Sequence, residues 1–190
     1  VGATANASQV AMTITAGSGG LTADGGTAAD TMTGGAGVDS FDGNGGNDTL
    51  SGAGGADDLD GGAGNDTIDG GAGDDTITTG AGNDTVTGGA GADTITVAAN
   101  YTLLDSIDGG DGTDILAITT ASGTTTLTAG TVSNVETIEM TAAAGGANVL
   151  ALAAIEGVTA VTIEDGGAVA VATTVSGLAT GSTVTIEETA

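Results

Sequence analysis

The stretch GGAGNDTIDGGAGDDTIT, residues 61–78, decides the fold because it consists of two nine-residue units in one register. The sixth position of each unit is an aspartate, Asp66 or Asp75, and the eighth is aliphatic, Ile68 or Ile77. Glycines in the first half favour tight turns, since glycine adopts positive φ without a Cβ clash. The last three positions predict a very short strand with one buried side chain.

The same unit occurs eight times over residues 25–96. Its sixth position is always aspartate: Asp30, Asp39, Asp48, Asp57, Asp66, Asp75, Asp84 and Asp93. Residues 97–108 interrupt the register, and GGDGTDILA (109–117) restores it with Asp114 and Leu116 in the same places. Asparagine at position five (Asn47, Asn65 and Asn83) is expected to take a left-handed conformation, which asparagine tolerates better than most residues.

Two units predict one coil of 18 residues with strands on opposite sides, so that alternate units stack. The eighth-position side chains then line two inner faces. We expect Met32, Leu50, Ile68 and Val86 on one face, and Phe41, Leu59, Ile77 and Ile95 on the other. The predicted fold class is therefore all-β, a parallel β-roll or β-solenoid with cation-bound turns.

The flanking segments also have a strand-like pattern. Residues 1–24 contain the alternating run Val10, Met12 and Ile14, which predicts a short strand. Residues 118–190 are rich in Thr, Ala and Val and predict a second β-solenoid segment of about three coils. Its expected strand series are ILAIT (115–119), VETIEM (135–140), AVTIE (160–164) and TVTIE (183–187), aligned on Ile118, Ile138, Ile163 and Ile186, and TTLT (125–128), NVLAL (148–152) and VAVA (169–172) between them. The predicted domains are 1–24, 25–117 and 118–190.

The charge is entirely of one sign. The chain has 25 acidic residues and no Lys, Arg or His, which gives a formal charge of −25. Two buried aliphatic side chains contribute about 1.5–3 kcal/mol each, whereas ordering a residue costs about 1–2 kcal/mol. Each thin coil therefore needs another source of stability. Oxygen-rich acidic loops favour Ca²⁺. The negative charge of the chain would repel nucleic acid, so no nucleic-acid partner is expected.

The chain lacks the residues of the common catalytic sites. A nucleophilic triad needs a base such as His, a zinc site needs His or Cys, and a phosphate loop needs Lys. None of these residue types occurs in the sequence. We expect no enzymatic activity. The longest apolar run is far below the roughly 18 residues of a membrane span, so no membrane insertion is expected.

The nonapeptide resembles the RTX repeats of proteins exported by Gram-negative type I secretion. The resemblance implies that each calcium ion lies between the loops of units n and n+2, held by position-six aspartates and loop carbonyls. It implies about six ions, shared by the pairs Asp30/Asp48, Asp39/Asp57, Asp48/Asp66, Asp57/Asp75, Asp66/Asp84 and Asp75/Asp93. Asp114 would need Asp105 or a neighbouring coil as its partner, and the position-nine residues Asp42, Asp60 and Asp69 are candidate second-tier ligands.

Four loop residues depart from the repeat pattern. Ala28 replaces the fourth-position glycine of the first unit, which makes Asp30/Asp48 the least regular pair. Asn44 and Ala53 replace second-position glycines, and Thr79 replaces a first-position glycine.

The run TVSNVETIEMTA (131–142) follows the repeat block. This succession resembles bacterial surface-layer proteins, in which RTX blocks alternate with Thr/Ala/Val-rich β-solenoid. This likeness implies an extracellular structural protein that folds and self-assembles with calcium. One alternative is a C-terminal export and folding module of a type I secreted enzyme, toxin or adhesin. Another is an ice-binding repeat, for which Thr67, Thr76, Thr85 and Thr94 form a short array that Asp58 and Ser40 interrupt.

Overall fold

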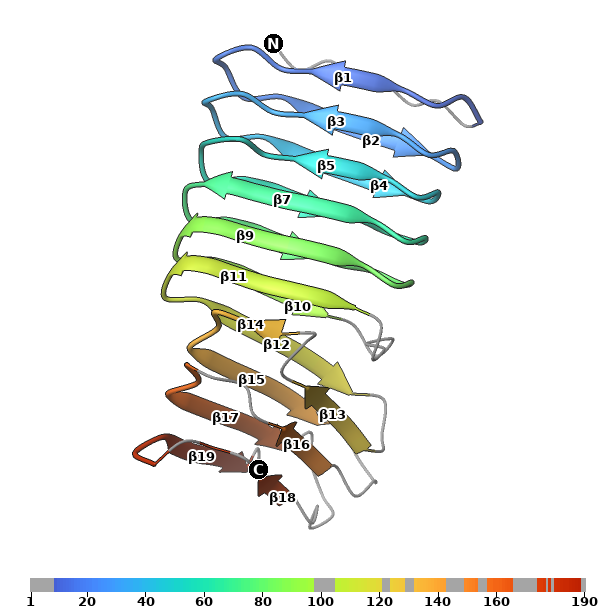
Figure 1. Cartoon of the computed structure of the whole chain (residues 1–190). Coiled ribbons are helices and arrows are strands. Elements are labelled where there is room, and N and C mark those ends of the chain that lie inside the picture. Colours follow the sequence, from blue (N-terminus) through green and yellow to red (C-terminus); the bar gives the residue numbers. More distant parts are fainter. Residues whose placement is uncertain are drawn as a thin grey trace.

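Short strands stack in parallel along one axis and form an all-β solenoid, as predicted (Figure 1). The computed structural model describes residues 9–97, 105–120, 124–128, 132–142, 149–153, 157–165, 174–176, 178 and 180–188. Every element within these residues is a strand. No helix in the described ranges has the length and apolarity needed to cross a membrane.

One side of the solenoid is a seven-stranded sheet in the order β1-β3-β5-β7-β9-β11-β14. Its strands are β1 (Thr13–Thr15), β3 (Thr31–Thr33), β5 (Thr49–Ser51), β7 (Thr67–Ala72), β9 (Thr85–Gly91), β11 (Ser106–Gly112) and β14 (Val132–Ser133). The register places these apolar residues level with one another: Ile14, Met32, Leu50, Ile68, Val86, Ile107 and Val132.

The opposite side is a nine-stranded sheet in the order β19-β17-β15-β12-β10-β8-β6-β4-β2. Its strands are β2 (Thr22–Gly26), β4 (Ser40–Asn44), β6 (Asp58–Asp60), β8 (Thr76–Thr78), β10 (Thr94–Val97), β12 (Ile115–Thr120), β15 (Thr137–Ala142), β17 (Ala160–Asp165) and β19 (Thr183–Glu188). Within the repeats the level residues are Ala23, Phe41, Leu59, Ile77 and Ile95.

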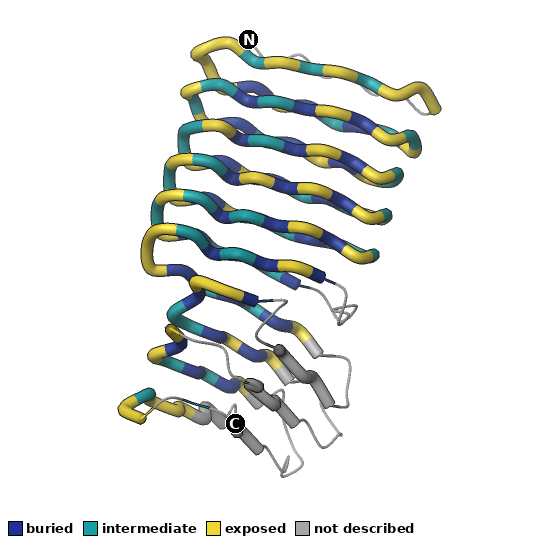
Figure 2. Tube along the Cα trace, in the orientation of Figure 1, coloured by how far each residue is buried: buried dark blue, intermediate teal, exposed yellow. Residues whose placement is uncertain are grey.

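The core lies between these two sheets. The predicted inner faces are confirmed, since the Met32 series lies in the seven-stranded sheet and the Phe41 series in the nine-stranded sheet. All eight of these side chains are buried in a single cluster. Figure 2 shows the resulting alternation of buried and exposed residues along each coil, which is the period of two expected of a strand with one buried face.

The N-terminal strand is shorter than predicted. It covers Thr13–Thr15, and Ile14 packs partly buried against the core. Val10 precedes the strand and is 70% exposed, so its assignment to a buried strand face was wrong. Met12 is held at the edge of the stack because its N–H donates to Asp30 Oδ1 over 2.7 Å.

The stack resumes before residue 109. Strand β11 pairs with β9, which places Ile107 beside Val86. The spacing between stacked residues rises here to 21, because the chain carries three extra residues in this coil. Residues 105–108, which fall in the predicted interruption of the nine-residue register, thus already belong to the stack.

The nine-stranded sheet runs without a break into the C-terminal segment, and β12 spans the predicted boundary at residue 117. Ile118 stands level with Met140, Ile163 and Ile186, so the expected alignment on Ile138 was wrong. A separate sheet contains β13 (Thr124–Thr128), β16 (Val149–Ala153) and β18 (Thr174–Ser176). The predicted strand at 169–172 lies outside the described residues.

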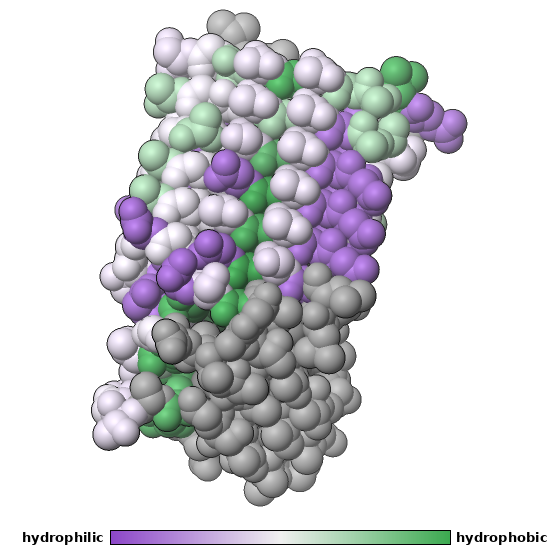
Figure 3. All heavy atoms as spheres, in the orientation of Figure 1, coloured by the Kyte–Doolittle hydropathy of each residue, from purple (hydrophilic) through white to green (hydrophobic). Residues whose placement is uncertain are grey.

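The outer faces of the two main sheets differ in charge. On the seven-stranded sheet, five exposed threonines align in one column: Thr13, Thr31, Thr49, Thr67 and Thr85. Figure 3 shows pale and green side chains along this face, with hydrophilic side chains gathered along its right-hand edge and others toward its lower left. On the nine-stranded sheet, Asp24, Asp42 and Asp60 align instead. The predicted array is divided between the sheets, with Thr67 and Thr85 on one and Thr76 and Thr94 on the other.

Candidate metal centre

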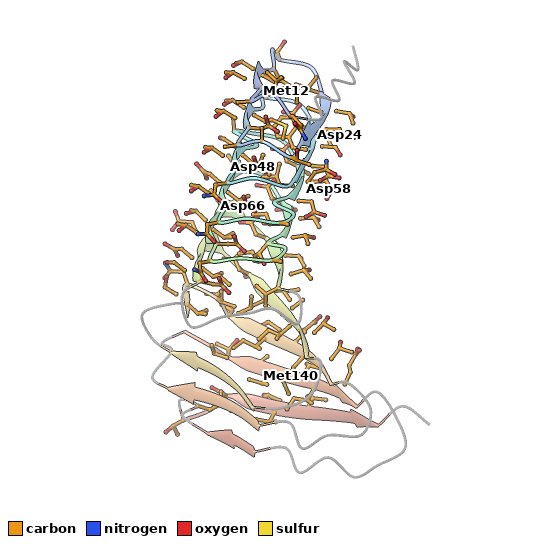
Figure 4. All side chains as sticks on the ribbon, turned by 90° about the vertical axis from the view of Figure 1, so that its right-hand side faces the viewer. Met12, Asp24, Asp48, Asp58, Asp66 and Met140 are labelled. Carbon is orange, nitrogen blue, oxygen red and sulfur yellow. The ribbon has the colours of Figure 1, made fainter. Side chains whose placement is uncertain are left out.

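The position-six aspartates form two ladders that run along the solenoid. Each aspartate lies buried directly before a strand. From Asp48 onward, its Oδ1 accepts the backbone N–H of the aspartate two units earlier, whereas Asp30 and Asp39 accept the N–H of Met12 and of Leu21. The N–H···Oδ1 distances are 2.7–2.9 Å in the six predicted pairs. The structure therefore brings every predicted pair together, including Asp30/Asp48, and Figure 4 shows Asp48 and Asp66 one above the other.

The second oxygen of most ladder aspartates is buried and has no hydrogen-bond partner. This holds for Oδ2 of Asp30, Asp48, Asp57, Asp66, Asp75, Asp93 and Asp114. Burying a carboxylate oxygen without a partner is costly, because the lost hydration is not replaced. The same side chain thus holds a neighbouring coil through one oxygen and offers a desolvated anionic oxygen through the other.

A backbone carbonyl flanks the same space in each repeat. At Gly61, a Cβ atom would lie 2.6 Å from the Thr79 carbonyl oxygen and 2.8 Å from Asp66 Oδ2. At Gly43, the corresponding distances to Gly61 O and Asp48 Oδ2 are 2.5 and 2.6 Å. Glycine at these two positions leaves the space of a side chain to two oxygens from different units, whereas Thr79 takes position one of the unit that contains Asp84.

These oxygens fit a calcium ion. Ca²⁺ takes six to eight oxygen ligands and accepts carboxylates and backbone carbonyls alike. No group of three or more acidic side chains converges within the described residues. Loop carbonyls would therefore have to complete the coordination that the ladder aspartates begin, as the resemblance implied.

We call the space between a ladder Oδ2 atom and the facing backbone carbonyl oxygen the cradle. Two glycine substitutions test whether the cradle differs from the rest of the loop. We expect Gly61→Ala to lower the free energy of unfolding by about 1–3 kcal/mol, since the new methyl overlaps two oxygens. It should also weaken calcium binding. Gly45→Ala is the matched control, because its Cβ would meet nothing closer than the Ala63 carbonyl oxygen at 3.7 Å. Urea unfolding in calcium compares the two, and equal effects would contradict the assignment of the cradle.

The left-handed residues are at positions two and four, which corrects the expectation for position five. Among described non-glycine residues, positive φ occurs at Asn44 (62°), Ala53 (69°) and Asn134 (50°). The position-five asparagines instead form a ladder of their own, in which Asn65 N donates to Asn47 Oδ1 and Asn83 N to Asn65 Oδ1, both over 2.9 Å.

Burial and mutual repulsion change the acidity of the ladder. Burial, together with the charges of neighbouring aspartates, raises the pKa of Asp66 and that of Asp75 from 3.8 to about 6. The backbone N–H that each accepts acts in the opposite direction. Burial also raises the pKa of these ladder residues: Asp48, Asp57, Asp84, Asp93 and Asp114.

These pKa shifts predict that acid stabilises the metal-free solenoid. A carboxyl whose pKa is higher in the folded chain binds more protons folded than unfolded, so its stabilising effect is lost as pH rises through about 6. In EDTA, we expect β-structure by circular dichroism to increase as pH falls from 7 to about 5. In calcium the trend should reverse, because protons compete for the same oxygens. A metal-free chain that loses structure over this acid range would contradict the prediction.

The remaining predicted residues fall in different places. Asp114 joins the ladder through Asp93, whose N–H it accepts over 2.9 Å, and not through Asp105. Asp105 extends the other ladder by accepting the N–H of Asp84 over 3.0 Å. Sequence reasoning missed this role, although DSID (105–108) repeats the spacing of aspartate and aliphatic residue.

The candidate second-tier residues lie on the strands, each directly before a position-one glycine. Asp42 and Asp60 are in register on the nine-stranded sheet, and Asp69 is on the seven-stranded sheet. Asp42 Oδ1 accepts the Asn44 N–H over 2.9 Å. Thr79 is buried at position one of the unit that contains Asp84, whose Oδ2 is not among the buried oxygens without a partner.

Comparison with known proteins agrees with this geometry. Residues 24–59 and 60–95 each match the family model described as "RTX calcium-binding nonapeptide repeat (4 copies)". Each match has the length of four nine-residue units, so the two together cover the eight units of the sequence repeat. No significant match was found among curated proteins or among solved structures.

Proposed function

Because residues 24–95 are RTX calcium-binding nonapeptide repeats, we propose that the chain is a calcium-dependent structural segment of a bacterial surface layer or extracellular filament. The dual use of the ladder aspartates carries this proposal. Asp66 accepts a backbone N–H through Oδ1 and leaves Oδ2 buried without a partner. Bound calcium would neutralise this oxygen and its neighbours, so that its binding energy stabilises a continuous stack of coils.

The ladder also favours a structural role over a catalytic one. The buried carboxylates are arranged at a constant spacing along the stack and bond to adjacent coils. We therefore propose that the chain has no enzymatic activity of its own. An extracellular location would suit it, because calcium modules outside the cell work at dissociation constants of about 0.1–1 mM.

Self-association would use the face that carries the threonine column, although the neighbouring column of the same sheet includes the exposed Asp69. The threonine column of the seven-stranded sheet presents hydroxyl and methyl groups without charge from Thr13 to Thr85. The opposite sheet carries the Asp24, Asp42 and Asp60 column, and burial together with Asp42 and Asp58 raises the pKa of Asp60. Chains of like charge repel, so copies would approach more readily through the threonine face.

Electron microscopy of the full chain tests the proposal. In about 5 mM calcium, well above the affinity range of extracellular modules, we expect ordered filaments or sheets that dissolve in EDTA. Thr49→Glu with Thr67→Glu should prevent assembly, because it places charge in the threonine column. Thr76→Glu, on the other sheet, is the matched control. Only monomers at every calcium concentration would favour an export and folding module of a secreted enzyme, toxin or adhesin.

A further inference from the structure

One aspartate ladder ends on a glutamate. After Asp75, Asp93 and Asp114, the next residue in the stack is Glu136, whose Oε2 accepts the Asp114 N–H over 2.8 Å. Beyond it, hydroxyl residues take the corresponding places. Thr159 N donates to Glu136 O over 2.8 Å, and Ser182 Oγ donates to Val158 O over 2.9 Å. Glu136 is thus the last carboxylate of this ladder in the described part of the chain.

The loop before Glu136 is a shortened repeat loop. Asp108 pairs with Ser133, so Gly109 and Asn134 begin corresponding loops. One loop runs through residues 109–114 and the other only through residues 134–136. Asn134 has a left-handed φ of 50°, and its Nδ2 donates to Asp108 Oδ1 over 2.7 Å. Asn44 makes the equivalent contact with Asp24 over 2.6 Å in the first coils of the repeat.

A cradle of the repeat type persists at this junction. Asp114 is 0% exposed, and its Oδ2 has no partner. A Cβ on Gly109 would lie 2.8 Å from Asp114 Oδ2 and would contact the Asn134 carbonyl oxygen. The charges of Glu136 and Asp108 act on Asp114 and, after burial, raise its pKa. The Asp114 Oδ2 and the Asn134 carbonyl oxygen therefore flank one buried space, Glu136 is bonded to the Asp114 N–H, and the chain has no cationic side chain to balance these charges.

We propose that Asp114, Glu136 and the Asn134 carbonyl hold a calcium ion where the repeats join the C-terminal coils. This site lies beyond residue 95, where the match to the repeat family ends. Calcium bound at this site stabilises β15 and the coils that follow it in the sequence, although those coils lack an aspartate ladder. Glutamate fits here because its extra methylene spans the gap that the shortened loop leaves.

The test compares four variants of the full chain. Asp114→Asn and Glu136→Gln keep an oxygen that can accept the ladder N–H but remove the charge. Glu139→Gln removes an exposed charge from the outer face of β15, and Asp66→Asn reports on the repeats. Calcium stoichiometry is measured by equilibrium dialysis, and hydrogen exchange of Thr137–Ala142 is measured with and without calcium.

Asp114→Asn should bind at least one ion fewer than the unmodified chain and lose most of the exchange protection that calcium gives to β15. Glu136→Gln should weaken one site roughly tenfold, the scale of a lost charged ligand, and keeps the test decisive if Asp114→Asn does not fold. Glu139→Gln should match the unmodified chain. If only Asp66→Asn loses calcium, the junction site is wrong and the repeat sites stand. If no variant loses calcium, both are wrong.

Discussion

Removal of calcium is expected to convert the described repeat coils, residues 25–97 and 105–117, from β-solenoid to coil. Each coil buries few large side chains and gathers carboxylates whose Oδ2 atoms have no partner, so folding and ion binding should be one equilibrium. Circular dichroism of the full chain in EDTA and then in millimolar calcium measures the change, and hydrogen exchange locates it. Mg²⁺ should substitute poorly, because it retains its waters and requires tight octahedral geometry. A β spectrum of equal strength in EDTA would rule out this coupling.

Asp66→Asn is expected to change stability in opposite directions with and without calcium. In calcium, the substitution weakens the sites shared with Asp48 and Asp84, and losing a site occupied at 100 times its dissociation constant costs about 2.7 kcal/mol. In EDTA, the amide removes a buried charge and can still accept the Asp48 N–H, so stability should rise by about 1–3 kcal/mol.

The control for Asp66→Asn is Glu139→Gln, which removes the same charge from an exposed position outside the repeats. It should change stability by less than about 0.5 kcal/mol in either condition. Urea unfolding measures the two variants in calcium. In EDTA, where the repeats are expected to be coil at neutral pH, circular dichroism compares the β-structure that each variant gains as the pH falls. If Asp66→Asn destabilises the chain equally with and without calcium, its role is confined to the hydrogen bond with the next coil.

The repeat itself was fully readable from the sequence, because its period is strict. Aspartate and an aliphatic residue recur at fixed positions, and stacking by two units follows from strand alternation. This was enough to predict both inner faces. The six aspartate pairs followed from the resemblance to RTX repeats, and the structure brings each of them together. It was also enough to place Leu116 in the core, despite the interruption before it.

Prediction failed where the period changes. Three extra residues separate Asp84 from Asp105, so the spacing is 21 residues and not the 18 of the repeats. Counting in units of nine therefore did not place Asp105 in the ladder. Glu136 was missed because it stands at the end of a loop without glycines and differs from aspartate in length. Ile138 was aligned with Ile118 by residue type, whereas the register pairs Ile118 with Met140. Here packing against the previous strand decides the register, and matching residue types did not show it.

The most direct test of the account is to locate the ions. Crystals grown with calcium and measured for its anomalous scattering should show peaks about 2.3–2.6 Å from the buried Oδ2 atoms of the ladder. We expect them beside Asp48, Asp57, Asp66 and Asp75. Peaks confined to the exposed strand residues Asp42 and Asp69, or no peaks in the loops, would contradict the central claim that the buried aspartate ladder holds the calcium.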